Sequence, residues 1–174
     1  PRRRLVRREE GSALGVAGRT QTLQQWKLLR GDPPDEPLRT LCHHDYLVGG
    51  LSIALDVKLD EALGPLLEAM GGTAPRIRVL DIRGPVFTVK LAQVEHHWEV
   101  DGLESLIDTL NRAFAADPAV KALAVLGEWE DMIQVWALPK PVLGRLLEHD
   151  WFRPANPPGL KAALAGFALR QAEP

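Results

Sequence analysis

An internal repeat constrains this chain more than any other feature of its sequence. From residue 51 to residue 84, the chain aligns without a gap with the stretch 43 residues further on. Pro75 corresponds to Pro118 and Gly84 to Gly127, so turn residues agree as well as apolar ones. A repeat of this length predicts two copies of one supersecondary unit that share a core. Other matching positions are Val57 and Val100, Glu61 and Glu104, Leu63 and Leu106, Leu67 and Leu110, and Leu80 and Leu123.

Each copy has the pattern of a strand, a helix and two further strands. Apolar residues alternate with small or polar ones over residues 51–57, which is typical of a half-buried strand. They recur at helical spacing over residues 60–70, and Gly71 and Gly72 then end the helix. The same patterns predict strands over residues 76–82, 86–91, 94–100, 120–126 and 132–138, and a second helix over residues 102–115 that is capped by Asp101.

These units predict an α+β fold. Duplicated β-α-β-β units, one over about residues 50–92 and the other over about residues 93–138, would form one mainly antiparallel sheet with both helices packed on one face. The other sheet face would then need a cover. Terminal helices, a partner chain or a ligand could each provide it.

The flanking segments divide the chain at residue 37. Residues 1–37 form a basic N-terminal segment with a short helix over residues 19–30 and a proline-rich linker over residues 32–37. Three prolines hold that linker extended. We therefore expect the duplicated domain over residues 38–174, with C-terminal helices between residues 139 and 170.

The composition of the chain limits which cellular compartment and which classes of partner we expect. The formal net charge of −2 gives no overall attraction to nucleic acid or to an anionic membrane. The single cysteine excludes an internal disulfide and fits a reducing compartment. No apolar stretch approaches the roughly 20 residues of a spanning helix. With residue usage typical of GC-rich bacterial genes, these features predict a bacterial cytoplasmic protein.

Two histidine pairs provide the first candidate site. His43 and His44 follow Cys42, while His96 and His97 lie in a predicted strand. Histidine and cysteine are common transition-metal ligands, but neighbours on a strand point to opposite faces, so only one histidine of each pair would join a site. The candidate ligands are Cys42, His44 and His97, and a transition metal is the only cofactor that the sequence leaves open. Histidines that are hydrogen-bonded and bind no metal are the simpler interpretation. A Cys–His nucleophile pair is a further alternative.

A tryptophan between three acids provides the second candidate site. Glu128, Trp129, Glu130 and Asp131 form a predicted hairpin turn. An exposed Trp129 would anchor a protein partner, because tryptophan is enriched at interaction hot spots. A Trp129 that folds back would instead cap the edge of the sheet.

The N-terminal arginines provide the third candidate site. Arg2, Arg3 and Arg4 belong to a run of five arginines within the first eight residues. Such a basic arm would contact nucleic-acid phosphates, although a solvated tail is the simpler interpretation.

The sequence contains no recognisable catalytic motif, and catalysis is therefore left open. We predict a non-catalytic binding or protein-interaction module that makes contact through the open sheet face and the acidic tryptophan hairpin. A protein partner or a second copy of the chain is expected, with a small molecule as a further ligand class; nucleic acid and membrane are not expected. The alternatives are a small metal- or Cys/His-dependent enzyme and a DNA-associated regulator that uses the basic N-terminus.

Overall fold

The computed structural model describes residues 18–172, with side chains through residue 167. Its mixture of helices and antiparallel strands confirms the predicted α+β class. Within this part of the chain, no helix combines the length and the apolar character that crossing a lipid bilayer requires. After a helix over residues 18–25, the elements are α2 (Leu38–His43), β1 (Gly50–Ala54), α3 (Leu59–Met70), the 3-10 helix η1 (Ala74–Arg76), β2 (Arg78–Arg83), β3 (Val86–Leu91), β4 (Val94–Glu99), α4 (Leu103–Ala113), β5 (Ala122–Trp129), β6 (Met132–Leu138), α5 (Lys140–Leu146) and α6 (Pro157–Ala172).

The strands form two three-stranded antiparallel sheets, so the predicted single sheet is wrong. One sheet has the order β1-β6-β5 and the other has the order β2-β3-β4. The connection between β3 and β4 explains the difference. It consists of two residues, Ala92 and Gln93, both with positive φ (49° and 67°), as in the tight turns that pair consecutive strands. β4 therefore pairs with β3, across the predicted boundary between the copies.

Each sheet combines a hairpin from one predicted copy with the first strand of the other copy. β5 and β6 pair with β1, whereas β2 and β3 pair with β4. Adding the 43-residue offset to the bounds of α3 gives residues 102–113, and α4 spans Leu103–Ala113. The two halves thus share their element order and helix positions, while a duplication of the sequence stays a prediction.

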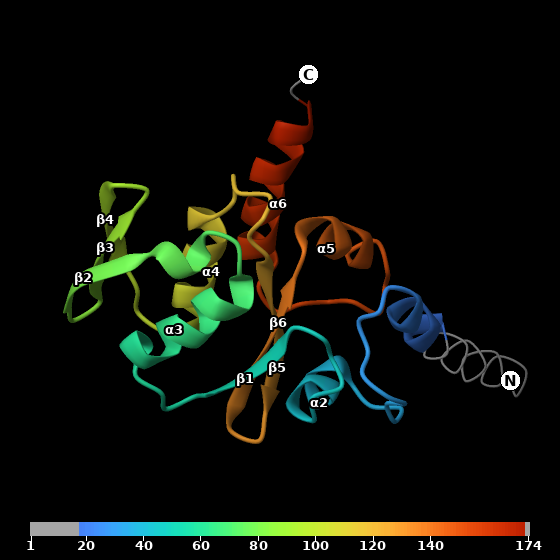
Figure 1. Ribbon diagram of the computed structural model, residues 1–174. Helices are drawn as coiled ribbons and strands as arrows, with labels where there is room; N and C mark the ends of the chain where they lie inside the picture. Colours follow the sequence, from blue (N-terminus) through green and yellow to red (C-terminus); the bar gives the residue numbers. More distant parts are fainter. Residues whose placement is uncertain (1–17, 173–174) are drawn as a thin grey trace, which may run out of the picture.

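The β1-β6-β5 sheet is covered on both faces by the protein itself (Figure 1). Along β6, Ile133 and Val135 are buried in the core that includes α3 and α4. The alternate residue Trp136 is buried in a second core with leucines of α2, α5 and residues 18–30. For this sheet, the terminal segments therefore supply the cover that the predicted open face required.

The predicted helix over residues 19–30 is too long, because its last turn pairs with another segment. The helix ends at residue 25, and Lys27 has a positive φ of 57°. Leu29 forms an isolated β-bridge with Leu47, and Val48 N–H donates to the carbonyl of Leu28 at 2.9 Å. These bonds hold the N-terminal segment against the second core.

The β2-β3-β4 sheet projects from the rest of the molecule (Figure 1). Phe87 and Val89 of β3 point into the first core and are buried. All six residues of β2 are exposed, and the opposite sheet face carries no described helix. The open sheet face of the described residues is therefore on the β2-β3-β4 sheet.

Candidate functional site

The uncovered face of the β2-β3-β4 sheet carries charged residues in rows. On this face, β2 carries an arginine near each end. β4 carries a glutamate at each of the corresponding positions on the other side of β3. This face is therefore polarised from one edge of the sheet to the other. The rows, read across β2, β3 and β4, are Arg78, Lys90 and Glu95; Asp81, Thr88 and His97; and Arg83, Val86 and Glu99.

Contacts within and between these rows leave the charged groups in solvent. Arg83 Nε lies 2.7 Å from Asp81 Oδ2, and the Arg83 side chain is still 87% exposed. His97 Nδ1 lies 3.0 Å from Thr88 Oγ1, and its Nε2 lies 3.5 Å from Glu95 Oε1. The side chains are thus loosely ordered by their neighbours and remain available to a partner.

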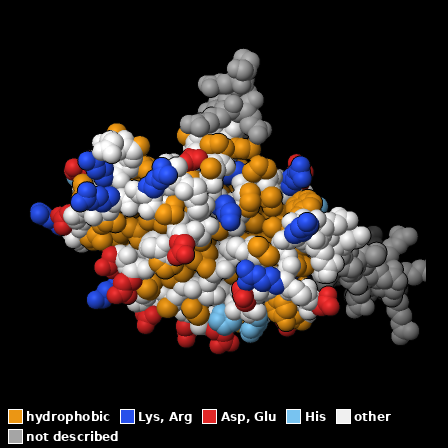
Figure 2. All heavy atoms as spheres, in the orientation of Figure 1, with side chains coloured by type: hydrophobic (Ala, Val, Ile, Leu, Met, Phe, Trp, Pro, Cys, Tyr) orange, Lys and Arg blue, Asp and Glu red, His pale blue; other side chains and the backbone are white. Residues whose placement is uncertain are grey.

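Exposed hydrophobic residues concentrate on the same sheet. Of eight large hydrophobic residues exposed among the described side chains, five belong to it. Figure 2 shows hydrophobic side chains gathered on the side of the molecule where this sheet projects, with basic side chains at their margin. Val79, Ile82 and Val94 lie on the side of the sheet that carries Phe87 and Val89, and Val86 lies on the uncovered face, so exposed apolar area is present on both sides of this sheet. Exposed apolar area next to charges is typical of a protein contact surface. The five residues are Val79, Leu80, Ile82, Val86 and Val94.

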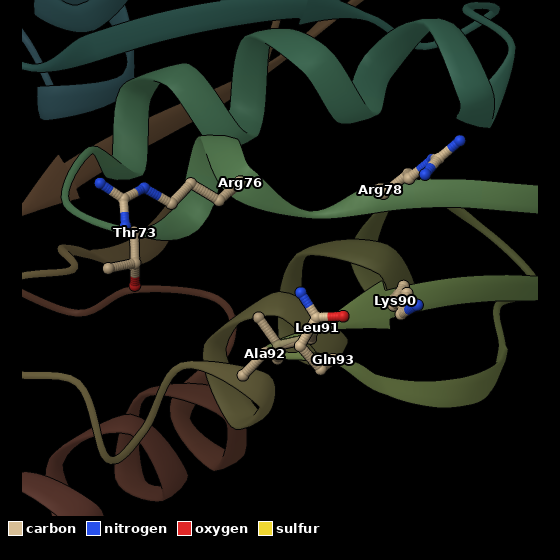
Figure 3. A pocket seen from close by; sticks show the side chains of 7 residues that line it. All are labelled: Thr73, Arg76, Arg78, Lys90, Leu91, Ala92 and Gln93. Atoms are coloured by element: carbon tan, nitrogen blue, oxygen red, sulfur yellow. The ribbon is translucent and has the colours of Figure 1, made fainter.

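A hollow of about 470 Å³ adjoins β2 and the turn between β3 and β4. Arg76, Arg78 and Lys90 line it together with Thr73 and Gln93. None of these three cations forms an ion pair with a described residue. Figure 3 shows Arg76 and Arg78 extending to opposite sides of the view, so their charged heads do not converge on one point. The hollow therefore extends the basic margin of β2.

The predicted hairpin site lies at the end of the other sheet. Glu130 and Asp131 form its turn with positive φ angles of 54° and 57°, and they are exposed together with Glu128. Trp129 is half-buried, and the guanidinium carbon of Arg39 lies 5.7 Å from its ring centroid. Since Arg39 belongs to α2, the tryptophan ring folds toward the body of the protein.

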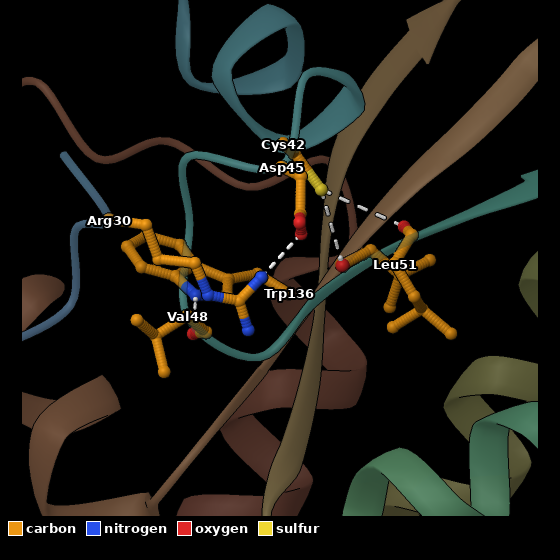
Figure 4. Close-up of polar contacts among 7 residues, drawn as sticks. Arg30, Cys42, Asp45, Val48, Leu51 and Trp136 are labelled. Atoms are coloured by element: carbon orange, nitrogen blue, oxygen red, sulfur yellow. Dashed lines mark hydrogen bonds and ion pairs between the residues drawn. The ribbon is translucent and has the colours of Figure 1, made fainter. Parts of the chain in front are cut away.

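Cys42 is buried on the inner side of α2, and its thiol is not activated. Its Sγ lies 3.5 Å from the carbonyl oxygen of Val135 and 3.7 Å from that of Leu51 (Figure 4). Burial raises the pKa of the Cys42 thiol to about 12, and the two backbone hydrogen bonds only partly oppose this shift. The thiol therefore stays protonated at neutral pH, whereas reactive cysteines have lowered pKa values.

The structure does not bring the predicted metal ligands together. Cys42 and His44 lie at α2, beside the β1-β6-β5 sheet, whereas His97 lies on the open face of the other sheet. Within the described residues, no group of three or more His, Cys, Asp or Glu side chains is arranged to hold a metal ion. The neighbouring His43 instead places Nδ1 at 3.2 Å from Nε2 of the buried Gln134.

Sequence reasoning missed the charged rows of the second sheet. The predicted nucleic-acid contacts Arg2, Arg3 and Arg4 lie outside the residues that the structure describes. The charged side chains of residues 78–83 and 94–99 are visible in the sequence, but the strand pairing that brings them onto one face is not. Comparison of the chain with protein-family models, with curated protein sequences and with solved structures found no match in any of the three.

Proposed function

We propose that this protein is a non-catalytic protein-interaction module whose main contact surface is the β2-β3-β4 sheet. One observation carries the proposal: five of the eight exposed large hydrophobic residues lie on this one sheet. Large apolar side chains at a free sheet are costly in water, and a bound polypeptide would remove them from it.

The strand edges add directional contacts to this surface. β2 and β4 are the outer strands of their sheet. An edge strand offers unpaired backbone N–H and C=O groups, to which an extended segment of a partner can add as a further strand. The charged rows would then select among partners, since like charges oppose binding.

The acidic tryptophan hairpin is a second contact in this proposal, with a smaller role. Its acids, Glu128, Glu130 and Asp131, are exposed, but the ring of Trp129 already contacts Arg39. A partner at this hairpin would therefore meet mainly charge, whereas the sheet offers both charge and apolar area.

Site-specific photo-cross-linking tests the proposal. A photoreactive residue at Leu80, which is 43% exposed on β2, should give discrete products with a polypeptide in cells that express the protein. Leu147 provides the matched control, because it is exposed to 39% but follows α5. Products from Leu80 and none from Leu147 would support the sheet as the contact surface. Equal products from both positions, or none from Leu80, would refute it.

A further inference from the structure

We propose that the β2 edge of one molecule pairs with the β4 edge of a second copy of the same chain. This inference rests on the proposed function, because it names the partner that the open sheet binds. It is carried by the two free edges of that sheet, by their complementary charges and by the spacing of those charges.

Side chains of the protein occupy the outer edge of β5 but leave the outer edges of β2 and β4 free. β5 is an outer strand of its sheet, and the side-chain amide of Asn111 both donates to the carbonyl of Leu123 (2.9 Å) and accepts from its N–H (2.8 Å). Asn156 accepts from the N–H of Val125 at 2.8 Å. No described side chain bonds to the backbone of β2 or β4 in this way. Their outward peptide groups are therefore open to a further strand.

The charges near the two ends of β2 complement those near the two ends of β4. On the uncovered face, β2 carries Arg78, Asp81 and Arg83, in the order basic, acidic, basic. β4 carries Glu95 and Glu99 on either side of His97. An arginine would face a glutamate at both ends of a β2–β4 pair, whether the strands run parallel or antiparallel.

A β-bulge gives the two strands the same spacing. Arg78 and Arg83 are five residues apart, so in a regular strand they would point to opposite faces. The bulge between Val79 and Asp81 inserts one residue, so both arginines lie on one face of the sheet. Their partner positions on β3 are four residues apart. Glu95 and Glu99 are likewise four positions apart on β4.

The same charges disfavour symmetric pairing. An antiparallel pair of two β2 edges would place Arg78 opposite Arg83, and a pair of two β4 edges would place Glu95 opposite Glu99. Like charges in direct cross-strand positions are destabilising. A β2–β4 contact joins two different surfaces, so it builds a ring or a chain of copies instead of a closed two-fold dimer.

The core-facing side of the sheet supports the same pairing. Val79 and Ile82 of β2 are 39% and 36% exposed, and Val94 of β4 is 55% exposed. Strand register places all three on the side that carries the buried Phe87 and Val89. Pairing β2 with β4 would extend this apolar side across the junction between two copies.

Sedimentation of the full chain with charge-swapped edges tests the inference. We compare the wild type, the β2 variant R78E/R83E, the β4 variant E95R/E99R, an equimolar mixture of these two, and the chain that carries all four substitutions. The control R145E/R153E makes the same change in net charge as the β2 variant, at exposed residues away from the sheet. Thermal unfolding of each variant verifies that it is folded.

The wild type should associate weakly, because a single strand edge buries little area, and its average mass should keep rising with concentration without levelling off at a dimer. Each edge variant should remain monomeric, since like charges then face each other. The mixture and the four-substitution chain should associate again, the control should behave like the wild type, and added salt should weaken association. A monomeric wild type, edge variants that associate like the wild type, or folded mixtures that stay monomeric would each overturn the inference.

The outcome is separable from that of the proposed function. If Leu80 cross-links to a different polypeptide while the wild type stays monomeric, the second-copy inference fails and the interaction module stands. If neither experiment gives a contact at this sheet, both fail.

Discussion

Three buried polar side chains of this protein stabilise its fold, whereas the charged side chains of the second sheet are exposed. Asn111 and Asn156 are buried and bond to the backbone of β5, and Lys140 is buried with Nζ at 2.6 Å from the carbonyl oxygens of Phe114 and Asp117. Each such group compensates its burial by hydrogen bonding, as buried polar groups must. By contrast, the charged residues of β2 and β4 are exposed. These three buried polar groups are therefore structural, whereas the charged groups of β2 and β4 remain in contact with solvent.

Cys42 provides a prediction at the residue scale. Because burial raises its thiol pKa from 9.0 to about 12, iodoacetamide should modify the folded protein at least a hundredfold more slowly than the unfolded chain. Intact-mass measurement gives a clean readout, since the chain has one cysteine. The neutral thiol is favoured in the fold, so its contribution to stability is complete below pH 9.0 and is lost as the pH rises toward 12. Rapid modification of the folded chain would show that Cys42 is not buried as described.

At the scale of the elements, local patterning located the helices and strands, but it could not pair them. Apolar spacing predicted α3, α4 and the strands to within a few residues, because the buried faces of Leu63–Met70 and Leu106–Leu110 repeat regularly. The pairing of β3 with β4 depends on the turn at Ala92 and Gln93. Neither alanine nor glutamine favours positive φ, so the sequence does not indicate a tight turn there. The candidate surface was missed for the same reason. Its charged rows exist only once β2, β3 and β4 are placed side by side.

The β3–β4 turn provides a prediction at this scale. Replacing Ala92 with Asn and Gln93 with Gly should raise the free energy of unfolding by about 1 kcal/mol, because these residues tolerate the positive φ of both positions. Urea unfolding measures the change. The control Gln93→Val should destabilise the protein, since a β-branched residue is strained at φ 67°. A destabilised Asn-Gly variant would contradict the tight hairpin that joins the two predicted copies.

At the scale of the whole molecule, the two sheets have different roles. The β1-β6-β5 sheet lies between two hydrophobic cores, and its central strand β6 has six buried residues. The β2-β3-β4 sheet is covered on one face only, and β2 is exposed throughout. The first sheet therefore supports the fold, and the second presents a surface whose charge and apolar area fit another strand.

Amide hydrogen exchange at low and high protein concentration tests this division most directly. In dilute solution, peptides from β6 should exchange slowly and peptides from β2 should exchange faster, because the outward amides of β2 have no strand partner while its other amides pair with β3. At high concentration, peptides covering residues 78–83 and 94–99 should become protected while those of β6 stay unchanged. Protection of β2 as strong as that of β6 in dilute monomer, or concentration-dependent protection confined to other segments, would contradict the assignment of the β2-β3-β4 sheet as the contact surface.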